Sequence, residues 1–91
     1  MIYEILPSLQ KKLNKLSKKD STLYGQVFNK IEEVISSANV EHYKNLRHDM
    51  KDKKRVHLGH FVLVFRFIKA ENKIIFDDFD HHDNIYKKTF K

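Results

Sequence analysis

The chain of 91 residues contains no cysteine. This absence excludes a disulfide framework and any zinc site with thiolate ligands, and it suits the reducing cytosol. Long apolar runs are also absent, because no stretch of the sequence approaches the ~18 residues that a membrane span needs. Near the N-terminus, Pro7, Gln10 and Lys11 interrupt the apolar residues where a signal peptide would continue them. We therefore expect a cytoplasmic protein without membrane contact, folded as one domain over residues 1–91.

Positive charge is in excess. Lys and Arg number 18 against 12 Asp and Glu, which gives a net charge of +6, and six histidines add charge at lower pH. A basic surface favours a polyanionic partner, because phosphates attract Lys and Arg and release counterions on binding. A lysine-rich surface that only keeps a protein in solution has the same composition. Composition alone therefore leaves both interpretations open.

Apolar spacing predicts a short N-terminal strand at 1–6 followed by two helices. The first helix begins near Pro7 and carries leucines at 6, 9, 13 and 16, the spacing of one helical face. Residues 17–21 supply a break with capping oxygens. The second helix is longer, and its apolar face comprises Leu23, Val27, Ile31, Val34, Ile35 and Ala38.

A long polar loop follows at residues 36–54, in which Tyr43 and Leu46 are the large apolar anchors. Loops of this length in compact domains are often functional. The alternative is an ordinary solvated connection. The basic residues of this loop are His42, Lys44, Arg47, His48, Lys51, Lys53 and Lys54.

Three strand-like segments come next: RVHL at 55–58, FVLVFRFI at 61–68 and KIIFDDF at 73–79. Gly59 and His60 form a two-residue link with glycine first, which predicts a type II′ hairpin turn with His60 exposed in it. Residues 70–72 make the second turn. With the N-terminal strand, these segments predict an α+β fold in which two helices pack on a mainly antiparallel sheet.

Alternation along the middle strand predicts which residues meet the helices. Phe61, Leu63, Phe65 and Phe67 share one face, and Arg66 lies on the other. Arg66 either pairs with Asp77 or Asp78 or remains open to an anion, because burying its charge without a partner is costly.

Arg55 and His57 share one face of their own strand in the same way. If the hairpin aligns that face with the face of Arg66, the three side chains line one side of the sheet together with cations from the loop.

The stretch FDDFDHHDNIYKK at 76–88 contains ligand types that suit zinc, manganese or iron. The ligands of such a site would be Asp77, Asp80, His81, His82 and Asp83. Their spacing argues against the site, because adjacent residues point apart and no HxH or HxxxH pair presents two imidazoles to one ion. The other interpretation is a strand end whose acids offset nearby lysines, so we predict no metal and no cofactor.

The order of these segments resembles the RelE/ParE toxin superfamily over nearly the whole chain. The matching motifs are Asn45-Leu46-Arg47, the hairpin from Arg55 to Phe67, and the ending His81 to Tyr86. The resemblance implies two helices against a sheet of about four strands. It also implies a toxin held inactive by a largely helical, acidic antitoxin. RelE-type members cut messenger RNA on the ribosome without a metal, whereas ParE-type members inhibit DNA gyrase.

Carried over to this sequence, the resemblance assigns Arg55 and Arg66 to the phosphate and His57 or His82 to proton transfer. Tyr86 would stack on a base or protonate the leaving group. The remaining RNA contacts would come from Arg47, Lys51, Lys53, Lys54 and His81.

One hairpin position departs from the family pattern. Val62 stands where many cleaving members have an arginine. A gyrase inhibitor needs no proton-transfer residues, so the histidines of the ending argue against it. A non-catalytic binding module of the same fold stays open because of Val62.

Overall fold

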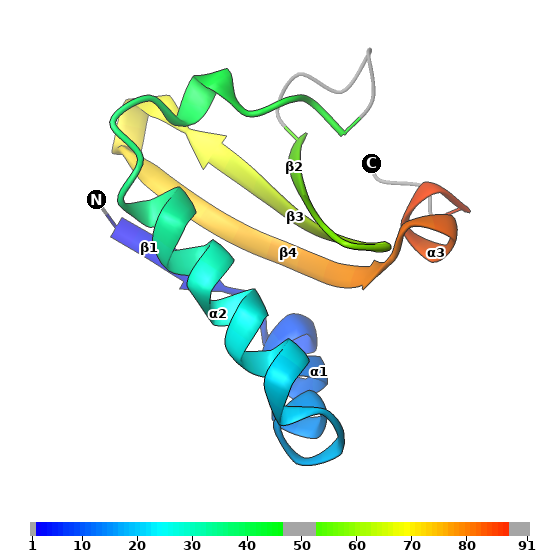
Figure 1. Cartoon of the computed structure of the whole chain (residues 1–91). Helices are drawn as coiled ribbons and strands as arrows, with labels where there is room; N and C mark the ends of the chain where they lie inside the picture. The colour runs from blue at the N-terminus through cyan, green and yellow to red at the C-terminus, as the bar shows by residue number, and fades with distance from the viewer. Residues whose placement is uncertain (1, 47–52, 88–91) are drawn as a thin grey trace.

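The described part of the chain is an α+β fold. A computed structural model defines residues 2–46 and 53–87 (Figure 1). The class, the N-terminal strand, the two helices and the antiparallel meander of three strands are all as the sequence predicts. A short helix at the end of the last strand was not foreseen. The elements in chain order are β1 (Ile2–Ile5), α1 (Pro7–Lys19), α2 (Ser21–Ile35), the 3-10 turn η1 (Val40–His42), β2 (Lys53–Leu58), β3 (Phe61–Ile68), the 3-10 turn η2 (Lys69–Glu71), β4 (Lys73–His81) and α3 (His82–Lys87).

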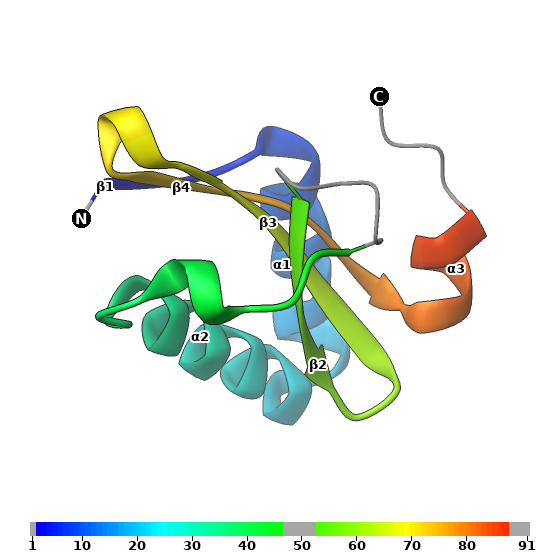
Figure 2. The same ribbon diagram turned by 90° about the horizontal axis from the view of Figure 1, so that it is seen from above.

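The four strands form one sheet in the order β1-β4-β3-β2. β1 pairs in parallel with the first half of β4, ending at Ile5 opposite Phe76, and the other two pairings are antiparallel. α1 then runs beside the second half of β4, where the Lys12 ammonium group lies 3.4 Å from the carbonyl oxygen of Phe79. The helices α1 and α2 therefore pack on the same face of the sheet. The short helix α3 lies apart from them, beyond the end of β4 (Figures 1 and 2).

Residues at the ends of the two long helices explain where each helix begins. Pro7 stands at the start of α1, where its missing amide costs nothing. A single residue, Asp20, separates the helices, and its carboxylate accepts a hydrogen bond of 3.1 Å from the amide of Leu23 at the start of α2. The break is narrower than the expected 17–21, and α2 ends at Ile35, so Ala38 lies beyond it and is exposed.

The main core lies between the sheet and the two helices. Phe65 and Phe76 at its centre are fully buried, with ring centroids 5.9 Å apart. The predicted helical and phenylalanine faces both point into it. Its buried members are Leu9, Leu13, Val27, Ile31, Val34, Val40, Leu63, Phe65, Ile74, Phe76 and Phe79.

A β-bulge in β4 decides which acid faces away from this core. The register shifts between Val64, which pairs with Asp78, and Phe65, which pairs with Phe76, so Asp77 is the extra residue. Phe76 and Phe79 both reach the main core although they are three residues apart. In a regular strand, residues an odd number apart point to opposite faces.

Both turns use residues with positive φ. Gly59 has φ 62°, whereas His60 is not among the described residues with positive φ. This combination fits the predicted type II′ turn, because type I′ needs positive φ at both positions. At the second turn, Asn72 takes the left-handed conformation with φ 50°, which asparagine tolerates better than most residues.

Candidate functional site

A second, smaller apolar cluster lies on the sheet face away from the main core. It comprises Leu46, Val62, Val64 and Ile85, each at most 3 % exposed, with Tyr86 packed against it. Ile85 comes from α3, so this six-residue helix covers the middle of β3. Val62, at the position where an arginine is usual, is therefore buried beneath α3 and offers no contact to a substrate.

Arg55 and His57 lie together on β2 beside this second cluster. The Arg55 Nη1 atom is 2.5 Å from His57 Nε2, and the Arg55 Nε–H donates to the carbonyl oxygen of Asn45 at 3.2 Å. Because the guanidinium can only donate, Nε2 accepts, and the neutral His57 ring carries its proton on Nδ1. Burial lowers the pKa of His57 below its usual 6.5, and the positive charges of Arg55, His82 and Lys44 lower it further. His57 is therefore a neutral imidazole at pH 7.

Arg66 is paired, which settles the alternative left open by the sequence. Asp77, whose side chain is 6 % exposed, accepts from Arg66 Nε at 3.2 and 3.1 Å and lies 3.1 Å from Arg66 Nη2. The same carboxylate binds the Lys53 ammonium group at 2.7 Å. Lys53 and Arg66 are direct cross-strand partners, and both bind the Asp77 carboxylate. The Arg66 side chain is still 32 % exposed.

Lys54 has a structural role. It is one of the few buried charged residues described, and its ammonium group lies within 3.4 Å of three oxygens in the segment before β2. Those oxygens are the carbonyls of Glu41 and Tyr43 and the side-chain amide of Asn45. Lys54 thus anchors residues 41–45. Because its side chain is buried there, it is little exposed for the expected RNA contact. Two other expected RNA contacts, Arg47 and Lys51, lie outside the described residues.

The helix α3, which follows β4, carries the remaining candidate site residues. His82 begins α3, and its Nδ1 atom lies 2.8 Å from an Asp83 carboxylate oxygen. Tyr86 lies one turn further on, partly buried against the second cluster. The charge of His82 is one of the causes that lower the pKa of His57. The His82 imidazole on α3 is therefore close enough to act electrostatically on the pair on β2. Arg55, His57 and His82, together with Tyr86, are called the β2–α3 surface below.

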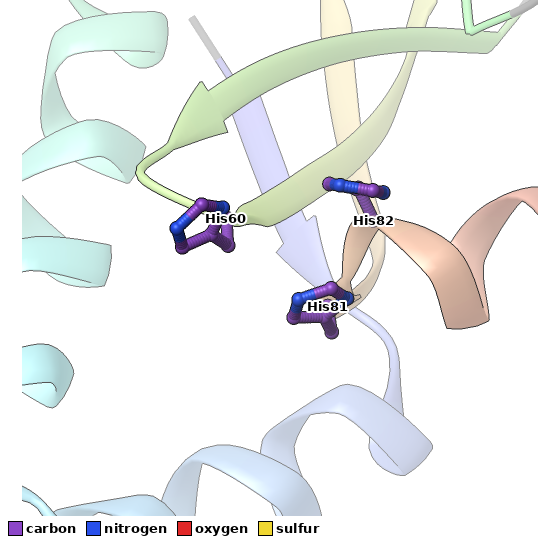
Figure 3. Close-up of side chains that lie close together, drawn as sticks. All are labelled: His60, His81 and His82. Carbon is purple, nitrogen blue, oxygen red and sulfur yellow. The ribbon is translucent and has the colours of Figure 1, made fainter.

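His60 is exposed in the hairpin turn, as the sequence predicts, but it does not lie alone. Its ring stacks on His81 with centroids 6.0 Å apart, and His81 lies 4.7 Å from the His82 ring (Figure 3). The hairpin turn brings it there, because Phe61 pairs with His81 across the β3–β4 ladder. Sequence spacing gave no sign of this group, since His60 is twenty-one residues from His81.

Two of the three acids considered as metal ligands, Asp77 and Asp80, bind cations and an amide instead, whereas Asp83 contacts His81 and His82. Asp77 binds Lys53 and Arg66, as described above. One oxygen of Asp80 lies 3.2 Å from the Lys12 ammonium group, and the other accepts from the Asn84 amide at 3.1 Å. These hydrogen bonds lower the pKa of Asp80 despite the opposing effect of its burial. Asp77 and Asp80 thus offset lysine and arginine, as the second interpretation of this stretch held.

The sequence is similar to that of a curated protein from Methanocaldococcus jannaschii. A scan against models of known protein families found no match. Among curated proteins, "Putative toxin RelE4" of Methanocaldococcus jannaschii is 54 % identical over 86 residues, which cover 93 % of this chain and 89 % of that protein. The chain belongs to the RelE toxin family.

Solved structures agree with this assignment at the level of the fold. Isolated RelE of Escherichia coli superposes with a TM-score of 0.72 at 21 % identity, covering 94 % of this chain and 90 % of that one. RelE in the intact E. coli RelBE toxin–antitoxin complex gives a TM-score of 0.71 at 22 % identity, with 88 % and 94 % covered. The RelE fold is therefore present over the described strands and helices.

No helix within residues 2–46 and 53–87 is long and apolar enough to cross a membrane. The longest, α2, has 15 residues.

Proposed function

We propose that this RelE-family protein is the toxin of a toxin–antitoxin pair, which cleaves messenger RNA on translating ribosomes in the cytoplasm. The observation that carries the proposal is the contact between Arg55 and the neutral imidazole of His57 at an accessible edge of the sheet. A fixed positive charge beside a proton acceptor is what phosphodiester cleavage requires. The family relationship supports the same conclusion.

The reaction begins with the ribose 2′-hydroxyl. Its oxygen attacks the adjacent phosphorus, the bond from phosphorus to the 5′-oxygen breaks, and the products are a 2′,3′-cyclic phosphate and a 5′-hydroxyl. The proton of the 2′-hydroxyl goes to a base, and the departing 5′-oxygen receives a proton from an acid. The chain's own groups supply the base, the acid and the positive charge beside the phosphate. No metal or cofactor takes part in the proposed steps.

Arg55 and His57 act in sequence. In the free protein the His57 Nε2 lone pair accepts from Arg55 and is not available to a hydroxyl. A phosphate draws the guanidinium to itself, because two parallel N–H donors match two phosphate oxygens better than they match one ring nitrogen. Nε2 is then released to accept the 2′-hydroxyl proton. Substrate binding thus activates the base.

His82 and Tyr86 both come from α3. His82 supplies the acid, since imidazole exchanges protons near neutral pH. Tyr86 stacks on a base beside the second cluster.

Arg66 and Lys53 have a supporting role. Asp77 fixes both side chains, and the guanidinium of Arg66, whose side chain is 32 % exposed, attracts the RNA backbone next to Arg55. The proposal also includes RNA contacts by His81 and by Arg47 and Lys51, the last two of which lie outside the described residues.

The antitoxin is proposed to be an acidic, largely helical chain, as the net charge of +6 favours. A groove between α1 and the ends of β3 and β4 suits the apolar face of such a helix, with lysines along its rim. It is lined by Lys12, Leu13, Lys15, Leu16, Lys19, Phe61, Phe79 and Asp80.

The test is primer extension on a defined message, with translating ribosomes and with naked RNA. We expect new stops within the codon in the decoding site, only when ribosomes are present. Arg55→Ala should lower the cleavage rate by about 100-fold, the usual cost of losing one donor to developing charge. Lys18→Ala, which removes an exposed cation from α1, is the matched control and should cleave normally. Equal rates for the two variants would refute the assignment of Arg55.

A second candidate is a binding module without catalysis. Two observations favour it: a buried valine, Val62, stands where an arginine is usual, and the cation of Arg66 is paired with Asp77. This candidate predicts that growth continues normally on expression and that no stops arise on ribosomes. Growth arrest without cut messages would instead point to gyrase, which a supercoiling assay tests.

A further inference from the structure

The geometry points to a transition-metal site formed by His60, His81 and His82, with Zn²⁺ as the ion that it fits best. Each imidazole offers one nitrogen, and the three nitrogens lie within 4.8 Å of one another. Figure 3 shows the rings gathered where the β2–β3 turn meets the end of β4. Three histidines with one open position are a known zinc arrangement.

The backbone already holds the three residues in place. Phe61 and His81 are partners in the β3–β4 ladder, and the amide of His82 donates to the carbonyl oxygen of His60 at 2.8 Å. Zinc–nitrogen bonds of about 2.0–2.1 Å require ligand nitrogens about 3.3 Å apart in a tetrahedron. The rings must therefore approach by about 1.5 Å, which side-chain rotation alone can provide. His60 is exposed, and the side chains of His81 and His82 are 39 % and 44 % exposed, so a large part of each ring faces solvent and not the core.

Asp83 is the second observation that points to a metal. Its carboxylate lies 2.8 Å from His82 Nδ1 and 3.7 Å from His81 Nδ1. Such a carboxylate holds the proton on Nδ1 and leaves Nε2 free to bind an ion, as in most protein zinc sites with histidine ligands. The amide of Asp83 also lies 3.2 Å from His81 Nδ1. Metal binding to His81 through Nε2 exchanges that contact for one with the carboxylate.

The chemistry of the donors selects the ion. Neutral imidazole suits Zn²⁺, Cu²⁺ and Ni²⁺, whereas Mg²⁺ and Ca²⁺ prefer oxygen ligands. The Mg²⁺ that ribosomes require will therefore not fill this site. The Asp83 carboxylate adds negative charge beside His81 and His82.

The site shares His82 with the β2–α3 surface, so bound zinc should block cleavage; this part of the inference rests on the proposed function. An imidazole that coordinates zinc has no lone pair for proton transfer. We thus expect zinc to switch the toxin off without any contribution from the antitoxin.

Binding is tested first, without reference to activity. The protein is prepared without a histidine tag and titrated with ZnCl₂ by calorimetry, and with CoCl₂ to observe the absorption of a tetrahedral cobalt site. We expect one ion per chain and a rise in Tm. His60→Ala should weaken zinc binding by more than about 100-fold, beyond the roughly 10- to 100-fold expected for the outer partner in Asp83→Asn. His42→Ala, which removes an exposed histidine from η1, is the matched control and should bind like the unaltered chain.

Equal zinc affinity in the unaltered chain and in His60→Ala would overturn the site, and so would the absence of binding. His60→Gln repeats the test with a side chain of similar size if the alanine variant folds poorly. In the ribosome assay, zinc should stop cleavage by the unaltered protein but not by His60→Ala, which also controls for effects of zinc on the ribosome. Zinc binding that depends on His60, without cleavage by any variant, would support the metal site and refute the proposed function.

Discussion

Replacing Ile85 by alanine should release α3 from the sheet. Ile85 is fully buried and is the buried residue of this helix. α3 has only 6 residues, and isolated helices shorter than about 12–15 residues are marginal in water. The packing of Ile85 on Val62 and Val64 is therefore what keeps α3 folded and holds His82 and Tyr86 in place.

The magnitude follows from the atoms removed. Ile85→Ala deletes three carbons, worth about 2.4 kcal/mol at about 0.8 kcal/mol per buried CH₂. An unfilled cavity would raise the loss toward the upper part of the 2–5 kcal/mol range observed for such changes. Undocking of α3 limits the loss, because the rest of the fold can persist without it. We expect the free energy of unfolding to fall by about 2 kcal/mol.

Two measurements distinguish release of α3 from general weakening. Hydrogen exchange should show that the α3 amides lose protection while β3 and β4 keep theirs. Cleavage on ribosomes should fall by about 100-fold or more, since misplacing catalytic groups by 1 Å can cost that much. Ile31→Ala in the main core is the matched control: it should lose comparable stability without selective loss of protection in α3. If α3 stays protected in Ile85→Ala and cleavage is unchanged, the second cluster does not position the site.

Three further predictions concern the charges around this cluster. Asp77→Asn leaves Lys53 and its arginine partner without their shared carboxylate, and urea unfolding should show a loss of about 3 kcal/mol, the lower end for breaking a buried ion pair. Val62→Arg restores the residue usual in the family, but it buries a charge under α3; it should lower Tm and expose α3 to exchange, and higher cleavage would contradict this placement. His57 should titrate below pH 6.5 by NMR in the presence of a zinc chelator, and Arg55→Met should raise that midpoint. Because folding lowers this pKa, its contribution to stability is present above pH 6.5 and is lost as the pH falls toward the folded value.

The fold was largely predictable because its signals are local. Leucine spacing in α1 and the period of α2 report one buried helical face each. Gly59 in a two-residue link reports the hairpin and its turn type. These features need only residues that are close in sequence, and the structure confirms them.

The missed features depend on pairing between distant segments. α3 buries one side chain, Ile85, so the polar sequence around it shows no helical period. The bulge at Asp77 is set by the requirement that Phe76 and Phe79 both enter the main core, and it decides which acid pairs with Arg66. The approach of His60 to His81 arises only from the β3–β4 register. The acids, imidazoles and arginines were recognisable as candidate site residues. Asp77 was foreseen as one of two acids that could pair with Arg66, whereas the contact between His60 and His81 was not foreseen.

The burial of Val62 explains why the arginine of the proposed site lies on β2 and not on β3. β3 is a central strand, covered on one side by the helices and on the other by Leu46 and Ile85. A charge in its middle would be desolvated on both sides and would displace α3. β2 is an edge strand, so Arg55 and His57 can meet a phosphate there without disturbing either apolar cluster. The family's arginine position is thus used here for packing, and that packing holds in place the helix that carries His82. Cleavage should accordingly depend on Arg55 far more than on any residue of β3.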